Sequence, residues 1–391
     1  MSEQISYRVN QGILYIDLQG RIDANNAPEV ETSIRAIQKE NPHEHMVLDA
    51  EKLTYISSAG LRVIMRLRKE DADLSVINAV PEVYQIFEMT GFTDIMHIYK
   101  AYRHLSIDGC TFIAKGANGA VYRYDPETVV KVYFNPDALP EIERELKNSR
   151  LAFVLGVNTA IPYDIVRVGD RYGSVMELLN ADSLTKMIVR DPQHLDEPVA
   201  YYVDTLKHIH SIQVEPGELP RMKQNLLNWV EFVKNELPKD QYEKLHALAE
   251  KLPDPNTLLH GDYHTNNIML QNGEALLIDM DTLSTGHPIL ELACMYNAFI
   301  AFNEWTPQNC MDFYGFDFDT AKRFWRLSLA RYLGTTDESV LNAVEQKAQV
   351  IGYTRLLRRT LRRNEPTRET ILRLCKEKLA EVLPQVDSLD F

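Results

Sequence analysis

The sequence predicts two domains in tandem, a small α/β domain followed by a larger α+β domain whose C-terminal part is helical. Three observations predict this organisation. Short strand and helix patterns alternate through the first hundred residues, a second set of strands begins near residue 111, and the chain beyond residue 281 is helical and rich in aromatic residues. A chain of 391 residues has room for both domains, since domains commonly take about 100 to 200 residues.

The first domain is predicted to be a small mixed sheet with helices packed on it, because short strands and helices alternate. Strands are expected at 5–9, 12–19, 45–49 and 73–77, and helices at 27–38, 59–69 and 81–90. The periodicity breaks over 102–109, without a long linker rich in proline or serine. We therefore place the domains at 1–105 and 106–391.

Composition restricts the classes of partner. The formal net charge of -14 argues against nucleic acid and anionic membrane as partners. The four cysteines lack Cys-x-x-Cys spacing, so they predict neither a zinc site nor a disulfide framework, and they fit a reducing cytoplasm. There is no signal peptide pattern, nor an apolar run approaching the roughly 20 residues that a membrane span needs. We expect a soluble cytoplasmic protein.

Four polar residues within about twenty positions have the types and spacing that phosphoryl transfer needs. Asp262 follows His260 in a turn after an apolar run, where its carboxylate is suited to orienting a substrate hydroxyl and taking its proton. Asn267 follows five residues later, and Asp279 ends the strand-like run 275–278. Both offer the oxygen ligands that magnesium prefers, and their order suits a hairpin.

A His-Gly-Asp turn alone is typical of an Asx-turn in any soluble protein. His260, Asp262, Asn267 and Asp279 together, with apolar strands on each flank, resemble the Brenner motif of the aminoglycoside phosphotransferase and choline kinase family. The resemblance implies a bilobal, protein-kinase-like fold with a large helical C-lobe. It also implies ATP and Mg²⁺, with Asp262 as catalytic base and Asn267 and Asp279 as metal ligands.

A later segment, 286–293, resembles the family's Gly-Asp-Pro-x-x-Asp-Leu-Ala pattern with two departures. His287 and Glu291 replace the two aspartates. These departures leave the predicted base and metal ligands unchanged, and they put in doubt whatever role the family gives those two positions.

The segment 111–133 resembles the nucleotide cradle of a kinase. Gly116 and Gly119 form a glycine-rich loop whose first glycine is replaced by Ala114, and Val121 is placed to cover the adenine ring. Lys131 is one charge in an apolar strand, and it resembles the lysine that holds the α- and β-phosphates. The alternative is an edge-strand lysine that opposes aggregation.

A lysine in that role needs a carboxylate partner, and a helix is predicted over 139–155. Glu141 and Glu145 share one face of this helix, four residues apart, and we choose Glu145 on the family pattern. The alternative is that either glutamate only solvates the helix. By resemblance, backbone groups near Glu177 and Leu178 meet the adenine edge. The N-lobe of the kinase-like domain is expected at about 108–180 and its C-lobe at about 181–391.

Ser57, Ser58, Gly60 and Leu61 follow a predicted strand and open a helix. This stretch and its surroundings, over about 1–103, resemble the STAS domain of anti-sigma factor antagonists. The resemblance implies that Ser58 accepts phosphate, whereas Ser57 stands where many members have aspartate. The plain alternative for Ser58 is an N-cap, worth roughly 1 kcal/mol to the helix. Both roles are compatible, because phosphate is favoured at a helix N-terminus.

Two further features have a plain explanation and a functional one. The aromatic residues beyond 281 suggest a packed helical core, with an aromatic cage for a quaternary ammonium as the alternative. The arginines between 355 and 363 suggest a solvated basic helix face, with steering of an acidic partner as the alternative. His208 and His210 lack the company of other metal ligands, so a structural role is expected.

Three hypotheses of function remain open. The first is a kinase that phosphorylates a hydroxyl group on a small molecule, with the STAS domain as a sensor or recruiter. The second is a regulatory kinase that phosphorylates Ser58 of a STAS domain. The third is a non-catalytic module that binds nucleotide and presents the STAS surface to an anti-sigma partner. Ala114, His287 and Glu291 keep the third open.

Overall fold

The computed structural model describes residues 5–10, 12–116, 118–364 and 366–391. Two compact units emerge, one of residues 1–106 with 165–170 and one of residues 107–164 with 171–391. The predicted boundary between 105 and 106 stays a prediction. The grouping of residues 165–170 with the first unit was not expected from the sequence.

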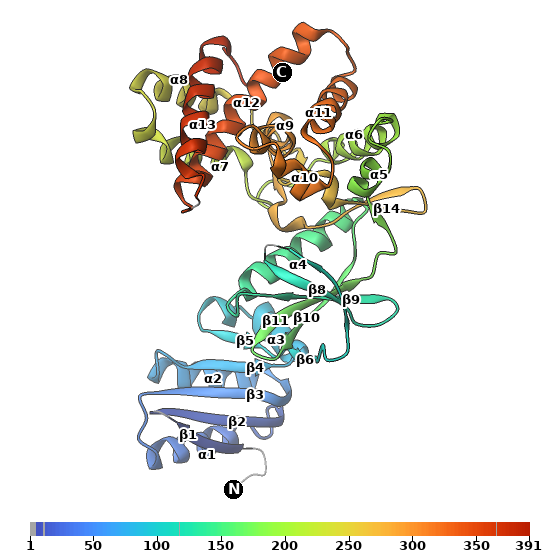
Figure 1. The fold of residues 1–391 in the computed structure, drawn as a ribbon. Coiled ribbons are helices and arrows are strands. Elements are labelled where there is room, and N and C mark those ends of the chain that lie inside the picture. The colour runs from blue at the N-terminus through green and yellow to red at the C-terminus, as the bar shows by residue number, and fades with distance from the viewer. Residues whose placement is uncertain (1–4, 11, 117, 365) are drawn as a thin grey trace. The chain divides into compact units, whose positions relative to one another are not determined.

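The first unit contains a five-stranded sheet of order β1-β2-β3-β4-β5 (Figure 1). β1 and β2 are antiparallel and the remaining pairs are parallel, so the sheet is mixed, as predicted. Its elements are β1 (Ile5–Asn10), β2 (Ile13–Ile22), α1 (Ala27–Glu40), β3 (His45–Ile56), α2 (Ser58–Glu70), β4 (Ser75–Ala79), α3 (Pro81–Met89) and β5 (Ile98–Lys100). A short strand, β6 (Arg103–His104), pairs in parallel with Val166 and Arg167 of β10 (Pro162–Val168).

The core of this sheet follows from strand alternation. In β2, Leu14, Ile16 and Leu18 are buried, while the residues between them are partly exposed. Successive side chains of a strand point to opposite faces, so one face meets the helices. The predicted strand and helix order is confirmed, and β3 extends past the predicted end at 49 to Ile56.

The second unit begins with an antiparallel sheet in which β9 pairs with both β8 and β11. Its elements are β7 (Thr111–Lys115), β8 (Gly119–Arg123), β9 (Thr128–Tyr133), α4 (Leu139–Val154) and β11 (Arg171–Glu177). The edge-strand alternative for Lys131 is therefore wrong, because β9 has a partner on each side.

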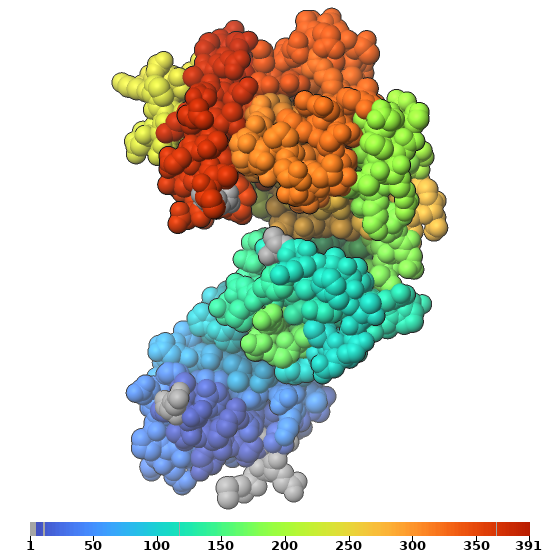
Figure 2. Space-filling model, viewed as in Figure 1, coloured from blue at the N-terminus to red at the C-terminus, as the bar shows by residue number. Residues whose placement is uncertain are grey.

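The remainder of the second unit is a helical lobe with short hairpins. Its helices are α5 (Leu184–Arg190), α6 (Asp196–Ser211), α7 (Met222–Phe232), α8 (Lys239–Lys251), α9 (Pro288–Phe299), α10 (Gln308–Tyr314), α11 (Phe318–Leu333), α12 (Glu338–Leu361) and α13 (Arg368–Val382). Its strands are β12 (Asp182–Ser183), β13 (Leu258–Leu259), β14 (Ile268–Gln271), β15 (Glu274–Leu277) and β16 (Ser284–Thr285). Figure 2 shows the residues of α13, in red, on the surface of this lobe. The predicted α+β architecture with a helical C-terminal part is confirmed.

Within the described residues, no helix is long and apolar enough to cross a membrane. All four cysteines are free thiols.

Candidate active site

Lys131 of β9 forms an ion pair with Glu145 of α4. Its Nζ lies 2.9 Å from Oε1 of Glu145, and 3.8 Å from Oδ1 of Asp279. Burial lowers the pKa of Lys131, but electrostatic interaction with the carboxylates of Glu145 and Asp279 and with the Tyr133 hydroxyl outweighs it, and the pKa is raised. The lysine is therefore a fixed cation. Glu145, and not Glu141, is the glutamate predicted to pair with this lysine.

Tyr133 belongs to the same group, although it is not among the residues predicted from the sequence. Its hydroxyl donates a hydrogen bond of 2.6 Å to Oε2 of Glu145, and its ring centroid lies 5.0 Å from Nζ of Lys131. Positions 131 and 133 lie on one face of β9, because side chains alternate along a strand. That period of two was the only sequence signal available for Tyr133.

The glycine-rich loop joins β7 to β8. The N–H of Gly116 donates to the carbonyl of Gly119 over 2.9 Å, and Ala117 lies outside the described residues. A Cβ on Gly119 would lie 2.6 Å from the carbonyl oxygen of Val132, so only glycine fits there. Val121 is directly opposite Lys131 in the β8–β9 register, which places both side chains on one face.

The backbone around Glu177 and Leu178 is already engaged in part. The N–H of Glu177 donates to the carbonyl of Ile161, and the N–H of Leu178 donates to the carbonyl of Glu127. These two donors are therefore not available to an adenine ring in this structure. An adenine contact at Glu177 and Leu178 stays a prediction, and it would have to use groups of these residues other than the two N–H groups.

The turn that carries Asp262 follows β13 and depends on glycine. Gly261 has a φ of 83°, and a Cβ there would lie 2.5 Å from the carbonyl oxygen of Thr282. His260 is fully buried, with its ring Nε2 3.1 Å from the carbonyl oxygen of Ile278. The Asp262 side chain remains about half exposed, with 48% of its surface accessible, so it can reach a substrate.

The charge of Asp262 is supported by its surroundings. Burial alone raises the pKa of this carboxyl, but His264, Arg355 and His260 outweigh burial and hold the pKa below its ordinary value. His264 Nε2 lies 3.6 Å from Oδ2 of Asp262. The carboxylate is therefore available as a proton acceptor near neutral pH.

Glu291, one of the two departures from the family pattern, has a structural role. It is buried in α9 and accepts the backbone N–H of His260 over 2.5 Å and that of Gly261 over 3.0 Å. Burial raises its pKa to about 7, although both N–H groups favour the ionised form. His287, the other departure, is the N-cap of α9, and its Nδ1 accepts the N–H of Ile289.

A hairpin brings the predicted metal ligands together. In the antiparallel β14–β15 pair, Ile268 is opposite Leu277, and the N–H of Ile278 donates to the carbonyl of Asn267. Asn267 Nδ2 donates to the carbonyl of Asp262 over 3.0 Å, which leaves the amide oxygen as the atom offered to a metal. Asp279 has a φ of 66° and a partly exposed carboxylate.

The donor chemistry fits magnesium. One carboxylate and one amide oxygen match a metal that usually takes one or two carboxylates and completes its shell with phosphates and water. No group of three His, Cys, Asp or Glu side chains suited to a metal exists among the residues described. Asn267 and Asp279 would therefore hold the ion together with substrate phosphates.

Asp281 is a second residue of the site that was not predicted from the sequence. Burial raises its pKa to about 7, and the charges of Asp279 and Glu145 add to the shift, while Lys131 opposes it. Asn148 of α4 donates to the carbonyl of Met280 over 3.0 Å, which holds this turn against the helix. The sequence signal for Asp281 was its position two residues after Asp279.

A pocket of about 570 Å³ opens beside Asp262. Phe302, Trp305 and Phe313 line it and are not buried. Other aromatic residues of this lobe are buried, as the packed-core interpretation predicts: Tyr296, Phe299, Phe324 and Trp325. The aromatic residues thus divide between core and pocket, which sequence spacing did not separate.

The arginines between 355 and 363 do not all lie on a solvated helix face. Arg362 and Arg363 are exposed, as predicted. Arg355 is not part of a solvated face, because its Nη1 lies 2.5 Å from Sγ of Cys294 and 3.4 Å from the carbonyl oxygen of Gly261, with Trp229 beneath the guanidinium. Arg355 therefore contacts the backbone of the turn that carries Asp262.

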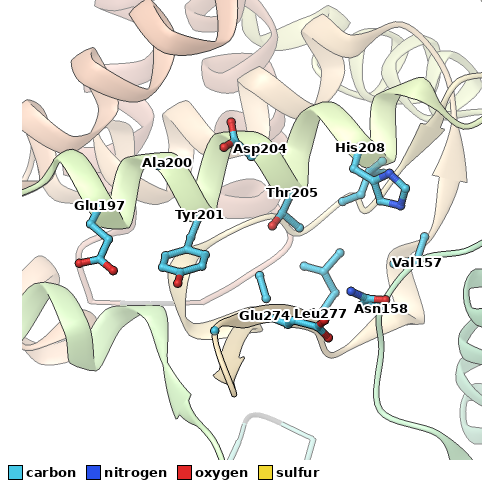
Figure 3. A pocket seen from close by; sticks show the side chains of 13 residues that line it. Val157, Asn158, Glu197, Ala200, Tyr201, Asp204, Thr205, His208, Glu274 and Leu277 are labelled. Atoms are coloured by element: carbon cyan, nitrogen blue, oxygen red, sulfur yellow. The ribbon is translucent and has the colours of Figure 1, made fainter.

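A second pocket, of about 440 Å³, lies between α6 and the β14–β15 hairpin (Figure 3). Figure 3 shows Tyr201 and Thr205 of α6 directed toward the hairpin residues Glu274 and Leu277. His208 lines this pocket, and its Nε2 lies 3.0 Å from the carbonyl oxygen of Gly156. None of the predicted catalytic residues lines this pocket.

In the first unit, Ser58 is exposed at the first position of α2. The N-cap is Ser57, whose side chain accepts the N–H of Ala59 over 3.2 Å. The predicted N-cap role of Ser58 is therefore wrong by one residue, because the helix begins at Ser58. Ser58 keeps an unburied hydroxyl at a helix N-terminus.

Two family models match the chain. Residues 109–338 match the phosphotransferase enzyme family, and residues 4–104 match the STAS domain. The chain belongs to the phosphotransferase enzyme family. It joins a STAS domain to a kinase-like phosphotransferase domain, so both predicted resemblances are confirmed.

The relatives of the STAS domain are anti-sigma factor antagonists. BtrV of Bordetella bronchiseptica, named as a proposed anti-sigma factor antagonist, is 36% identical over 91 residues, covering 22% of this chain and 78% of BtrV. The anti-sigma F factor antagonist of Paenibacillus polymyxa is 27% identical over 103 residues, covering 25% of this chain and 88% of that protein.

The solved structures similar to the chain include aminoglycoside phosphotransferases. The ADP-bound aminoglycoside phosphotransferase APH(2'')-Ib is 17% identical with a TM-score of 0.47, covering 78% of this chain and 99% of that chain. The GDP and kanamycin complex of APH(2'')-IIIa is 15% identical with a TM-score of 0.49, covering 76% of this chain and 98% of that chain.

Proposed function

We propose that the phosphotransferase domain moves the γ-phosphoryl group of ATP to a hydroxyl acceptor, and that the STAS domain regulates this transfer or recruits a partner. The observation that carries this proposal is the convergence of Lys131, Glu145 and Asp279. All three belong to the second unit. The carboxylate of Glu145, which pairs with Lys131, and that of Asp279, the proposed metal ligand, both lie within 3.8 Å of the lysine Nζ. Phosphoryl transfer depends on this kind of positioning and electrostatic stabilisation.

In the proposed mechanism, Lys131 holds the phosphates and Glu145 holds Lys131. Asp262 orients the acceptor hydroxyl and accepts its proton while the oxygen attacks the γ-phosphorus in line. The bond from that phosphorus to the bridging oxygen breaks, and ADP leaves. Asn267 and Asp279 would hold magnesium, which would supply positive charge to the phosphates. Gly116, Gly119 and Val121 cover the nucleotide.

The test uses the full chain with Mg²⁺ and γ-labelled ATP, with a panel of small alcohols as acceptors. We expect labelled acceptor and ADP in equal amounts from the wild type, and a loss of at least a hundredfold in Asp262→Asn, since a positioned base contributes roughly 10²–10⁴-fold. Asp240→Asn on the exposed start of α8 is the matched control. ATP binding without transfer to any acceptor would favour the non-catalytic alternative instead.

A second candidate function is a partner switch in which Ser58 of a STAS domain is the acceptor and an anti-sigma type protein is the partner. Its support is the exposed Ser58 hydroxyl at the start of α2. The same labelling experiment separates it from the first candidate by mapping the labelled peptide. Label that disappears in both Ser58→Ala and Asp262→Asn, and persists in Ser57→Ala, supports the switch.

A further inference from the structure

Gly261, the residue before the proposed base Asp262, has to be a glycine. It has a φ of 83°, and a Cβ at this position would lie 2.5 Å from the carbonyl oxygen of Thr282. Glycine is also the residue with the freest backbone, so it leaves the direction of the chain into Asp262 undetermined. Contacts from other parts of the second unit must therefore orient the peptide that joins Gly261 to Asp262.

Two charged side chains hold Gly261 from two different helices. Glu291 of α9 accepts its N–H over 3.0 Å, and Nη1 of Arg355, in α12, lies 3.4 Å from its carbonyl oxygen. The N–H of a residue belongs to the peptide before it, whereas the carbonyl belongs to the peptide after it. The peptide between Gly261 and Asp262 is therefore held by Arg355 at its carbonyl and by Nδ1 of His260, 3.3 Å from its N–H.

The crossing of α9 and α12, which lie side by side in Figure 1, brings Arg355 to this position. A Cβ on Gly352 would lie 2.6 Å from Oδ1 of Asn297, and Nδ2 of Asn297 donates to the carbonyl of Gly352 over 3.0 Å. The two helices are therefore in close contact here. Three residues further along α12, Nη1 of Arg355 lies 2.5 Å from Sγ of Cys294, which is three residues before Asn297 on α9.

The guanidinium of Arg355 is held by further contacts. Its central carbon lies 5.5 Å from the ring centroid of Trp229 in α7, within the distance of a cation–π contact. Electrostatic interaction with Cys294, and after it with Asp262 and Glu291, outweighs burial and raises the pKa of Arg355. The side chain is therefore a charged donor in a fixed place, and hydrogen bonds from charged donors are the stronger kind.

We propose that Arg355 is a positioning residue for phosphoryl transfer, whose guanidinium orients the peptide between Gly261 and Asp262 and so holds the Asp262 carboxylate in place for the acceptor hydroxyl. This inference rests on the proposed function, in which Asp262 is the base. Arg355 is not one of the residues that line the pocket beside Asp262, so its role does not require contact with the acceptor. Position matters here, because a shift of about 1 Å in a reacting group costs on the order of 10²-fold in rate.

Steady-state kinetics on the full chain with Mg²⁺ tests this role, with ATP and the alcohol that the wild type labels varied in turn. Arg355→Met removes the donor and keeps a long side chain in the same space. We expect kcat to fall by roughly 10- to 100-fold, because a charged donor is lost and the base is displaced. Both KM values are expected to stay within about twofold of wild type, since neither substrate touches Arg355.

Arg355→Lys keeps a cationic donor, although it loses the planar fork of the guanidinium. Its kcat is expected to lie at least about threefold above that of Arg355→Met and below that of wild type. Arg358→Met is the matched control, because it makes the same substitution three residues further along α12, and its kcat should stay within about twofold of wild type. Thermal unfolding of each variant sets an assay temperature well below every midpoint. Should Arg355→Met not fold, a lower kcat at unchanged KM in Arg355→Lys remains the required result.

Hydrogen exchange measures the same role without turnover. The N–H groups of His260 and Gly261 are bonded to Glu291 in this turn. A peptide covering 259–264 is expected to exchange about tenfold faster in Arg355→Met than in wild type, because local opening of the turn becomes easier. Peptides of the β14–β15 hairpin should keep the wild-type rate, which separates a local effect from a general loss of stability.

Three kinetic results would overturn the inference and leave the kinase function standing: an unchanged kcat in Arg355→Met, a raised KM at unchanged kcat, or no gain of Arg355→Lys over Arg355→Met. An equal loss in Arg358→Met would overturn it as well. If the wild type transfers phosphate to no acceptor, the proposed function fails, and exchange then decides whether Arg355 holds the turn. Faster exchange confined to 259–264 supports that contact, and unchanged exchange removes it.

Discussion

The hydroxyl of Tyr133 donates a hydrogen bond of 2.6 Å to Oε2 of Glu145, the carboxylate that also holds Lys131. Tyr133→Phe removes this bond and keeps the ring beneath Lys131. We expect kcat/KM for ATP to fall by roughly 10- to 100-fold, the value of one hydrogen bond to a charged group, with the KM of the acceptor unchanged. Steady-state kinetics with each substrate varied in turn measures the split. Tyr163→Phe, at a half-exposed tyrosine, is the control. Equal changes in both KM values would contradict a positioning role.

Lys131 and Glu145 are expected to act as one unit. Lys131→Met should lower kcat/KM by about 10²–10³-fold, as loss of a group that stabilises transition-state charge does. Glu145→Gln should cost nearly as much, and the double variant little more than either. Double-mutant kinetics should therefore give a coupling of at least about 1 kcal/mol. Additive losses would show that the ion pair has no joint role.

The carboxylate of Glu291 anchors the catalytic turn, so its removal should destabilise the fold. Glu291→Ala leaves the buried N–H groups of His260 and Gly261 without a partner, at a cost of about 2 to 4 kcal/mol in the free energy of unfolding. Denaturant unfolding measures the change. Glu369→Ala, at an exposed side chain of α13, should lie within about 0.5 kcal/mol of wild type. An unchanged free energy of unfolding in Glu291→Ala would refute the anchoring role.

Asp281 should make the stability of the metal-free protein depend on pH. Its pKa is raised to about 7 by burial, whereas an unfolded aspartate titrates at roughly 4. Because the unfolded chain ionises first, Asp281 lowers stability progressively as pH rises from about 4 to 7, and not beyond. Asp281→Asn should therefore gain about 2 to 3 kcal/mol more over wild type at pH 8 than at pH 5.

Thermal unfolding of the metal-free protein at the two pH values measures this difference. Asp319→Asn, at an exposed position on α11, is the control variant. A gain that is equal at pH 5 and pH 8 would show that the Asp281 carboxyl titrates normally.

The identity of the α2 N-cap makes a prediction for two adjacent serines. Ser57→Ala removes the side chain that accepts the N–H of Ala59 and should destabilise the helix start by about 1 kcal/mol. Ser58→Ala should change it by less than about 0.5 kcal/mol, since Ser58 is exposed. Hydrogen exchange of the first-turn amides of α2 in the full chain separates the two. Faster exchange in Ser58→Ala than in Ser57→Ala would reverse the assignment.

The sequence by itself determined the local parts of this protein. Strand and helix order in the first unit follows from residue alternation, and the hairpin that brings Asn267 near Asp279 follows from local spacing, since antiparallel register is set by a short turn. The resemblance to both families rested on such contiguous motifs, and the family models confirm it.

Only the tertiary structure decided which side chains lie close together in one site. Tyr133, Asp281 and Glu291 lie at the site because α4, the turn after β15 and α9 pack there. Burial then shifts the pKa of each of these groups. Arg355 and Arg359 lie one helical turn apart, yet one supports the catalytic turn and the other lines a pocket. Spacing along the chain gives the face of a helix, whereas what that face meets depends on residues far away in the sequence.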